Sequence, residues 1–275
     1  MKSNSEKLAF VSDLTIRSVV SGKCLVHNVS FQVAKGECLG IVGESGSGKT
    51  LCCKALMKLL PFGLTASGEA IFENTNMLQA SEKQARQIRG TGISAILQQP
   101  MTSFDPLYTL GSQLSEVLRE KLGLDKKSAR ERTLDILKKV NLDEAVYSKY
   151  PHQLSGGMLQ RCMIALSLAL GSKLVVADEP TTALDAQNQF EVLQRLKRMR
   201  EKYATTLIFI SHDLGAVQML ADRILVMHRG ESVEYGNAEE IFNHPQKEYT
   251  KYLVNTRLTL TCSFEKAIGA VDDKR

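Results

Sequence analysis

The sequence lacks any uninterrupted apolar run of the roughly 18 to 20 residues that a membrane-spanning helix needs. Its first residues, MKSNSEKLAF, also lack the apolar core of a secretory signal. These two absences predict that the chain stays in the cytosol.

Cysteine pairs and metal-ligand clusters are absent as well. The six cysteines form no CxxC pair and show no zinc-ligand spacing, which predicts reduced, mostly buried thiols and excludes a disulfide framework or a structural metal. The five histidines are scattered without ligand spacing, so the chain itself is not expected to bind nickel or a similar metal. These residues are Cys24, Cys38, Cys52, Cys53, Cys162 and Cys262, and His27, His152, His212, His228 and His244.

The sequence also lacks a strong charge of one sign. Its 35 Lys and Arg residues exceed its 30 Asp and Glu residues by only five, a weak attraction for anions and no nucleic-acid footprint. Many basic residues fall in a helical, charge-rich stretch over about 110–140, which we interpret as a solvated helix face rather than a nucleic-acid surface. With 43% hydrophobic and 24% charged residues, the composition is globular and excludes collagen-like or disordered chains.

Short apolar runs that alternate with helical patterns predict the fold class. The runs CLGIV (38–42), LVVA (174–177), TTLIFI (205–210) and RILVM (223–227) are typical of buried strands. Helical spacing separates them, as in FEVLQRLKRMREK, so the pattern predicts an α/β protein with a mostly parallel, doubly wound sheet. The helical stretch between the first and later strands indicates an inserted helical lobe.

Residues 43–50, GESGSGKT, have the spacing of a phosphate-binding loop. The motif follows a predicted strand and precedes the helical pattern LCCKALMKLL, which is the context that such a loop requires. Its glycines let backbone N–H groups surround phosphate oxygens at a helix N-terminus. Lys49 is then expected to reach the β and γ phosphates and Thr50 to ligate Mg²⁺. The alternative is a glycine turn with no ligand.

Two adjacent carboxylates end the predicted strand in LVVADEP. Ligands bind at the carboxyl edge of such sheets, so Asp178 is expected to hold Mg²⁺ through water. Glu179 is one residue farther along and can polarise the water that attacks the γ-phosphate. An acidic turn after a strand is the structural alternative.

LSGGMLQR, residues 154–161, opens another apolar helical pattern between the phosphate loop and the carboxylates. A string of this kind in this position resembles the signature of the ATP-binding-cassette ATPases and argues against a generic nucleotide kinase. Ser155, Gly156 and Gly157 at a helix start form an anion site with an open backbone and a positive dipole end. In the family this second site closes on ATP held by the opposite subunit, which implies a head-to-tail dimer.

The remaining landmarks of the resemblance follow in chain order and cover nearly the whole chain. Gln98 in ILQQPMTSFDP resembles the Q-loop, Asp185 in ALD the D-loop, and His212 in FISHD the switch histidine. Gln98 can touch water at the metal site, and His212 can donate a hydrogen bond to γ-phosphate oxygens.

The resemblance thus implies ATP and Mg²⁺ as cofactors and an α/β P-loop NTPase fold of the ATP-binding-cassette type. A mostly parallel core sheet, an antiparallel β subdomain and an inserted α-helical subdomain are expected. The catalytic residues are expected to be Lys49, Gln98, Glu179 and His212. The nucleotide-binding residues are expected to be Gly43, Glu44, Ser45, Gly46, Ser47, Gly48, Lys49, Thr50, Ser155, Gly156, Gly157 and Asp185, and the metal ligands Thr50, Gln98 and Asp178. The expected domains are a cassette over 1–260, with its helical subdomain at about 101–153, and a polar tail over 261–275.

One element of the family pattern is missing. Cassettes usually stack an aromatic ring on adenine, but residues 11–30 contain no Phe, Tyr or Trp, and Ile16 is near the expected place. We therefore expect weaker base stacking and a looser preference for adenine. Cys52 and Cys53 directly follow the loop and are either small buried residues or thiols open to alkylation near the phosphates.

Further stretches resemble the peptide and nickel importer branch of the family. They include QQPMTSFDPLYT, YPHQLSGGMLQR, ADEPTTALD and IFNHPQKEYTKYL. LSGGMLQR, and a tail without the longer cysteine-containing extension typical of peptide subunits, favour nickel or metal-chelate import over import of dipeptides or oligopeptides. Selectivity for the solute would lie in partner proteins.

The resemblance also implies partners and a location. They are a second cassette subunit, a paralogue or a second copy, two transmembrane permeases, and indirectly an extracytoplasmic solute-binding protein, without nucleic acid. The chain is then expected at the cytoplasmic face of the cell (inner) membrane, as a peripheral subunit. A DNA-repair cassette would carry a long heptad insertion, a translation factor two cassettes, and an inactive binding module would lack Lys49, Glu179 or His212; none of these applies.

Overall fold

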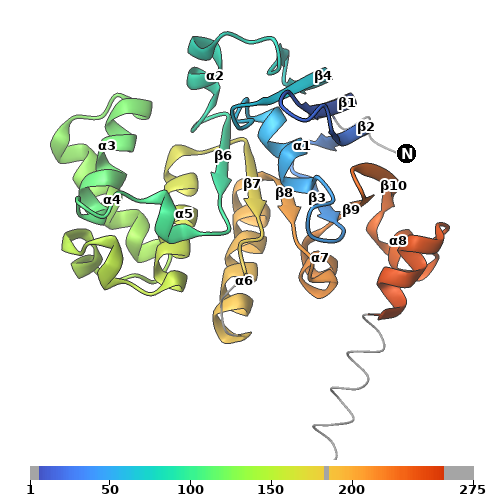
Figure 1. The fold of residues 1–275 in the computed structure, drawn as a ribbon. Helices are drawn as coiled ribbons and strands as arrows, with labels where there is room; N and C mark the ends of the chain where they lie inside the picture. The colour runs from blue at the N-terminus through green and yellow to red at the C-terminus, as the bar shows by residue number, and fades with distance from the viewer. Residues whose placement is uncertain (1–5, 183–185, 257–275) are drawn as a thin grey trace, which may run out of the picture.

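Two β-sheets form the centre of the molecule, with a helical lobe at one end and α8 at the other (Figure 1). The computed structural model describes residues 6–182 and 186–256. The strands are β1 (Lys7–Ser18), β2 (Cys24–Ala34), β3 (Cys38–Val42), β4 (Leu64–Phe72), β5 (Thr75–Asn76), β6 (Ile93–Ile96), β7 (Leu174–Asp178), β8 (Thr206–Ile210), β9 (Arg223–His228) and β10 (Glu231–Asn237). The helices are α1 (Lys49–Leu56), α2 (Glu82–Ile88), α3 (Leu110–Leu122), α4 (Lys126–Lys139), α5 (Gly156–Leu170), α6 (Ala186–Tyr203), α7 (Leu214–Leu220) and α8 (Ala238–Asn243), and the 3₁₀ helices are η1 (Pro100–Ser103), η2 (Glu144–Ser148) and η3 (Pro151–Gln153). Residues 248–256 are also helical.

The larger sheet is parallel except at one edge. Its strand order is β10-β9-β3-β8-β7-β6, and only β10 pairs antiparallel with its neighbour. The smaller sheet, β2-β1-β4-β5, is antiparallel throughout. The mostly parallel core and the antiparallel subdomain that the sequence predicts are therefore both present.

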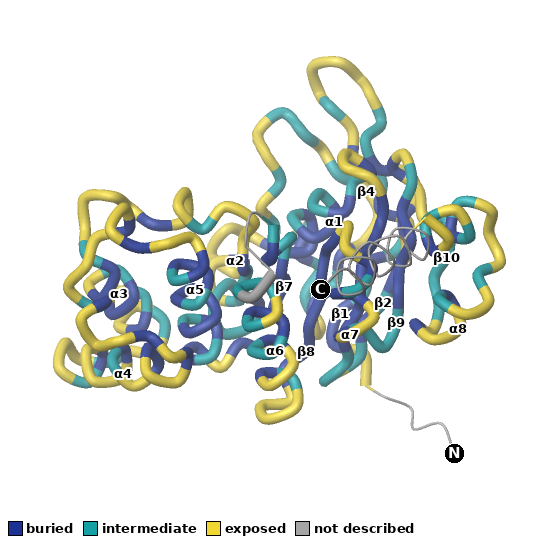
Figure 2. Tube along the Cα trace, turned by 90° about the horizontal axis from the view of Figure 1, so that it is seen from below, coloured by how far each residue is buried: buried dark blue, intermediate teal, exposed yellow. Residues whose placement is uncertain are grey.

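Alternate residues of the central strands face two separate cores. In β7, Val175 and Ala177 pack with the helices α3 to α7, whereas Leu174 and Val176 pack with α1 and the antiparallel sheet. Both faces of these strands are buried, which explains why the sequence shows continuous apolar runs there instead of alternation. The dark interior of the tube in Figure 2 follows these strands between the helical lobe and the antiparallel sheet.

The inserted lobe is helical because its segments begin with good caps. Thr109 accepts a hydrogen bond from the Ser112 backbone at the start of α3, and Asp125 accepts from Lys127 and Ser128 at the start of α4. All regular elements described between residues 100 and 153 are helical, and α5 then leads back to β7. The lobe thereby places the start of α5 at its edge, which is relevant to the site.

The structure departs from the sequence prediction at the end of α1 and in the elements after β9. Helix α1 ends at Leu56, because Lys58 takes a left-handed conformation with φ of 53° that stops the helix before Pro61. Strand β10, helix α8 and the helix over 248–256 were not anticipated. The proposed tail over 261–275 lies outside the described residues. No helix in the described part of the chain combines the length and the apolarity that a bilayer crossing requires.

The structure decides between the two interpretations of Cys52 and Cys53. Their side chains are 0% and 1% exposed in the core between α1 and the antiparallel sheet. Burial raises the pKa of the Cys52 thiol to about 12, and it also raises the pKa of Cys53. They are small buried residues rather than accessible thiols.

We therefore predict that iodoacetamide at about pH 8 labels Cys24 in the native chain and leaves Cys38, Cys52, Cys53 and Cys162 unmodified. Cys24 is half-buried, whereas the other four are buried. A thiol pKa of about 12, as for Cys162, leaves roughly one thiolate in ten thousand at that pH. Peptide mass spectrometry before and after denaturation measures the labelling, and fast native labelling of Cys52 or Cys53 would contradict the burial.

Candidate functional site

The loop between β3 and α1 is fixed by its backbone surroundings. A Cβ at Gly43 would lie 2.0 Å from the Met227 carbonyl oxygen, so the close approach of β9 excludes every side chain there. Gly46 has φ of 78° and open space where a Cβ would be. The loop is thus packed on one side and open on the other.

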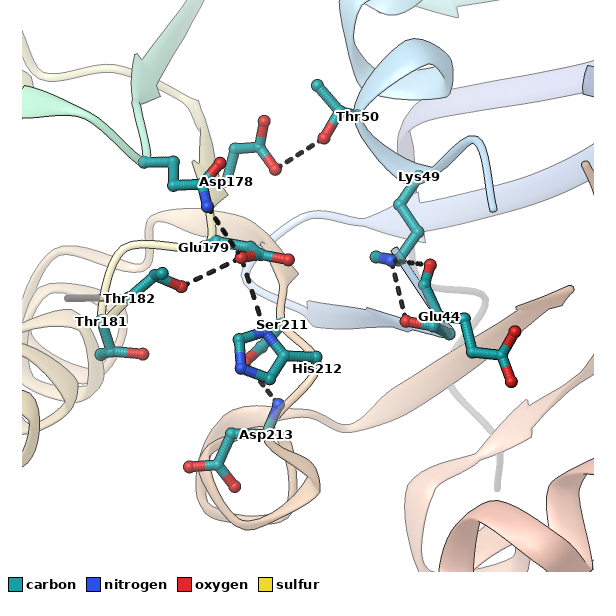
Figure 3. A network of polar contacts seen from close by, with 12 residues as sticks. Glu44, Lys49, Thr50, Asp178, Glu179, Thr181, Thr182, Ser211, His212 and Asp213 are labelled. Carbon is teal, nitrogen blue, oxygen red and sulfur yellow. Dashed lines mark hydrogen bonds and ion pairs between the residues drawn. The ribbon is translucent and has the colours of Figure 1, made fainter. Parts of the chain in front are cut away.

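Lys49 begins α1 and points back into the loop. Its Nζ donates to the carbonyl oxygens of Gly43 at 2.8 Å and Glu44 at 2.7 Å (Figure 3). The side chain is buried, which lowers its pKa, while Glu179, Asp178 and Glu44 oppose that change. A cation that lies among backbone groups at the start of a helix is well placed to bind a phosphate.

Thr50 and Asp178 meet next to the loop. The Thr50 hydroxyl donates to Asp178 Oδ1 at 2.9 Å, from the start of α1 to the end of β7. Burial raises the pKa of Asp178, against the hydrogen bond from Thr50. Hard oxygen donors in this number fit Mg²⁺, which takes one or two carboxylates together with substrate phosphates and water. No cluster of three or more His, Cys, Asp or Glu in the described residues could enclose a metal by itself.

Side chains from the segments after β6, β7 and β8 contact the Glu179 carboxylate. Its Oε2 accepts hydrogen bonds from Gln98 Nε2 at 3.1 Å and from Thr182 Oγ1 at 3.0 Å, and His212 Nδ1 lies 3.4 Å away (Figure 3). Its backbone is left-handed, with φ of 46°, which costs a non-glycine residue on the order of 1 kcal/mol. A carboxylate fixed this firmly at a sheet edge can hold and polarise one water molecule.

Some of these groups line one cavity of about 250 Å³, whereas Asp178, Thr182 and His212 do not. Part of the predicted loop lines it together with Gln98 and Glu179, and Leu25 closes one wall. The loop residues that line it are Ser45, Gly46, Gly48, Lys49 and Thr50. Gly43 and Glu44 instead line a second, larger cavity with His212, and Ser47 is buried.

The predicted signature residues do not join this cavity. Ser155 caps α5 by accepting a hydrogen bond from the Met158 backbone at 3.3 Å, and Gly156 is exposed with open space around it. Gly157 is buried against Asn188. The start of α5, the anion site expected from the sequence, is therefore separate from the cavity at this chain's own loop. Asp185 lies outside the described residues.

Two features of the site differ from the sequence analysis. Ile16 is 0% exposed, so it cannot contact a base, and the aliphatic wall near the phosphates is Leu25. Thr182 was missed, although a hydroxyl three residues after a carboxylate could have signalled its contact with Glu179. No comparable signal in the sequence predicts the position of Leu25, because that position results from the packing of β2 against the loop.

The comparisons with known proteins agree with this geometry. The sequence model of the ABC transporter family matches residues 26–182. The metal-staphylopine import system ATP-binding protein CntD of Staphylococcus aureus is 40% identical over 97% of this chain and 99% of its own length. The oligopeptide transport ATP-binding protein OppD of Bacillus subtilis is 41% identical over 96% of this chain and 76% of its own length.

A solved structure has a similar fold. The dimeric post-hydrolysis structure of the ATP-binding cassette MJ0796, bound to ADP and Pi, superposes with a TM-score of 0.75 at 27% identity. The match covers 84% of this chain and 98% of that one. It confirms the predicted α/β cassette fold.

We predict that Thr182→Val lowers the rate of ATP hydrolysis about tenfold, the effect of losing one hydrogen bond to a charged group. The KM for ATP should change little, because Thr182 does not line the phosphate cavity. Thr182→Ser, which keeps the hydroxyl, should restore most of the rate. Steady-state kinetics on the three proteins measures this, and equal rates for Val and Ser would contradict a positioning role.

Proposed function

The chain belongs to the ABC transporter family, and from that premise we propose that it powers the import of nickel or another metal, carried as a chelate. It is an ATPase with ATP and Mg²⁺ as cofactors, and the ATP-binding subunit of an ABC importer. The proposed mechanism of hydrolysis rests on one observation, namely that Gln98, Thr182 and His212 all contact the Glu179 carboxylate.

The proposed reaction follows from the residues around the cavity. Lys49 leaves the Gly43 and Glu44 carbonyls and binds the β and γ phosphates, to which the bare amides of the loop also donate. Thr50, Asp178 and Gln98 would hold Mg²⁺, which would offset charge on the phosphates. Glu179 orients and polarises the attacking water, while His212 donates to the γ-phosphate oxygens.

A second cassette subunit is proposed to complete the site. Ser155, Gly156 and Gly157 are at the start of α5 and do not line the chain's own phosphate cavity, so their anion site would be available to nucleotide on another subunit. The similar cassette MJ0796 is a dimer in its structure with ADP and Pi. A paralogue is the proposed partner, and a homodimer is the alternative. The unit proposed over 1–260 would then act as one half of the motor.

Permease subunits are the proposed recipients of the motion. An apolar cavity of about 280 Å³ lies between the helical lobe and β6, and Leu97, next to Gln98, lines it. Met101, Leu107 and Tyr108, farther along the same segment of the chain, are exposed apolar residues. A cytoplasmic permease helix seated there would move with Gln98, which links its position to Glu179. This contact would hold the chain peripherally at the inner face of the membrane, with an extracytoplasmic binding protein supplying solute.

The proposal that the cargo is a metal chelate is supported by the similarity to CntD, which extends over nearly all of both sequences. The similarity to OppD favours a second candidate, import of dipeptides or oligopeptides. In the described residues, which include all five histidines, no metal-binding cluster is found. A metal cargo would therefore be recognised by the partner proteins.

We predict that Gly156→Asp abolishes hydrolysis by the assembled cassette pair while the isolated chain still binds ATP. The acid adds a favourable charge at the start of α5, where no described atom outside its chain neighbours and its own helix lies within 4 Å of the new Cβ. It would also repel the triphosphate of the partner subunit. Titration of the isolated chain and hydrolysis by the pair measure the two effects. The control is Lys126→Asp, at the first residue of α4; a fully active Gly156→Asp pair would contradict the shared site.

For the solute, we predict that cells carrying Glu179→Gln lose uptake of labelled nickel and retain uptake of a labelled dipeptide. The substitution removes the carboxylate and keeps the shape of the site. Glu201→Gln, at an exposed position near the end of α6, serves as the matched control. Loss of only dipeptide uptake would reject the metal proposal, and loss of neither would reject both importer proposals.

A further inference from the structure

The stretch IFNHPQKEYTKYL, residues 241–253, packs beside the phosphate loop although it is distant from it in the sequence. The Glu234 carboxylate accepts hydrogen bonds from the backbone N–H groups of Gln246 at 3.0 Å and Lys247 at 3.2 Å. This contact fixes the start of the helix over 248–256. Tyr252 and Leu253 from that helix line a cavity together with Gly43 and Glu44 of the loop. The C-terminal helix is therefore anchored against the first half of the loop.

Three side chains make the connection, and we call Glu44, His228 and Tyr249 the brace. The Tyr249 ring lies on the His228 ring, with centroids 4.0 Å apart and a tilt of 35°. His228 Nδ1 lies 3.8 Å from Glu44 Oε2. Burial raises the pKa of the Tyr249 hydroxyl, and the Glu44 backbone beside it opposes that rise. The brace thus joins β9, the C-terminal helix and the second residue of the phosphate loop.

His228 Nδ1 is buried without a hydrogen-bond partner among the described residues. A buried polar atom left unpaired costs about 1 to 3 kcal/mol. At 3.8 Å its distance to Glu44 Oε2 is slightly too long for a hydrogen bond. A shift of well under 1 Å in Glu44 would supply the missing partner. This distance fits a hydrogen bond between His228 and Glu44 that forms in another conformation of the loop.

The position of Lys49 indicates which state that is. In the structure, Lys49 holds the first half of the loop through the Gly43 and Glu44 carbonyls. When Lys49 turns toward phosphates, both carbonyls lose this donor, and the Glu44 carbonyl keeps the hydrogen bond from the Ser47 backbone N–H at 3.1 Å. The first half of the loop is then held less firmly. The brace is the side-chain contact that remains to hold Glu44 in place.

We propose that His228, supported by Tyr249, is a positioning residue for the phosphate loop. It closes a hydrogen bond to Glu44 when Lys49 moves to the nucleotide. The bond favours the ATP-bound loop over the free one, so it raises affinity for ATP without touching the ligand. This role concerns nucleotide binding and is independent of which solute is transported.

The test compares His228→Leu with His228→Asn in the full chain. Leucine keeps the volume and removes Nδ1, whereas asparagine keeps a nitrogen near the place of Nδ1. We expect His228→Leu to weaken Mg²⁺–ATP binding about tenfold, the effect of losing a hydrogen bond to a charged group. The unfolding temperature without nucleotide should stay the same or rise, because an unpaired buried atom is gone. His228→Asn should retain most of the affinity. Equilibrium titration and thermal unfolding provide the two readouts.

A double-mutant cycle with Glu44→Ala tests the contact from its exposed side, where folding is not at risk. The Glu44 side chain is 58% exposed. Each single variant should weaken ATP binding, and the double variant should be no weaker than the more affected single. His244→Ala, an exposed histidine in the same stretch, is the control and should bind ATP normally. Unchanged affinity in His228→Leu, fully additive effects, or affinity losses that only parallel losses of nucleotide-free stability would overturn the proposal.

Discussion

The buried ammonium of Lys49 is the interaction on which the arrangement of the site depends. Its partners in the structure are two carbonyls and the Ser47 hydroxyl of its own loop, and burial lowers its pKa while Glu179 and Asp178 oppose that effect. The loop therefore folds around its own cation. A phosphate that enters must replace these carbonyls as the partner of the ammonium, and it also gains the amides at the start of α1. Binding and rearrangement of the loop are thus one event, so contacts that hold the loop elsewhere bear directly on affinity.

The two carboxylates at the end of β7 are adjacent in sequence but differ in surroundings. Asp178 accepts one hydrogen bond and its pKa is raised mainly by burial, which makes it a receptive ligand for a cation. Glu179 accepts hydrogen bonds from Gln98 and Thr182 and faces His212. In the proposed reaction Gln98 must give up part of this contact to reach the metal site. Any partner that moves the segment after β6 therefore changes the restraint on Glu179, a physical route from a permease to the hydrolytic carboxylate.

Local chemistry accounts for what the sequence made predictable. The strand–glycine–helix order located Lys49 and Thr50, and the apolar strand before Asp178 located the carboxylates, because these signals lie within a few residues of one another. Ile16 was placed wrongly, since burial of one face of β1 depends on the partner strands β2 and β4. The contact between Thr182 and Glu179 depends on the left-handed backbone conformation of Glu179, which was not predicted from the sequence. Tyr249 and Glu44 are about 200 residues apart, and only the packing of the C-terminal helix brings them together.

The single chain contains a nearly complete hydrolytic arrangement, which limits what a partner has to add. Glu179 is held in place already, Lys49 and Thr50 line the phosphate cavity, and Asp178 accepts a hydrogen bond from Thr50. The start of α5, the proposed second anion site, does not line this cavity. In the proposed pair, a second subunit would therefore supply stabilisation of the γ-phosphate rather than orientation of the water-polarising carboxylate. Stabilisation by a helix start requires the γ-phosphate to be present, so closure is favoured with ATP and disfavoured after hydrolysis. The same contact would then set both the rate of hydrolysis and the direction of the cycle. The step that a transport partner can control would be the closing of the pair, not the preparation of Glu179.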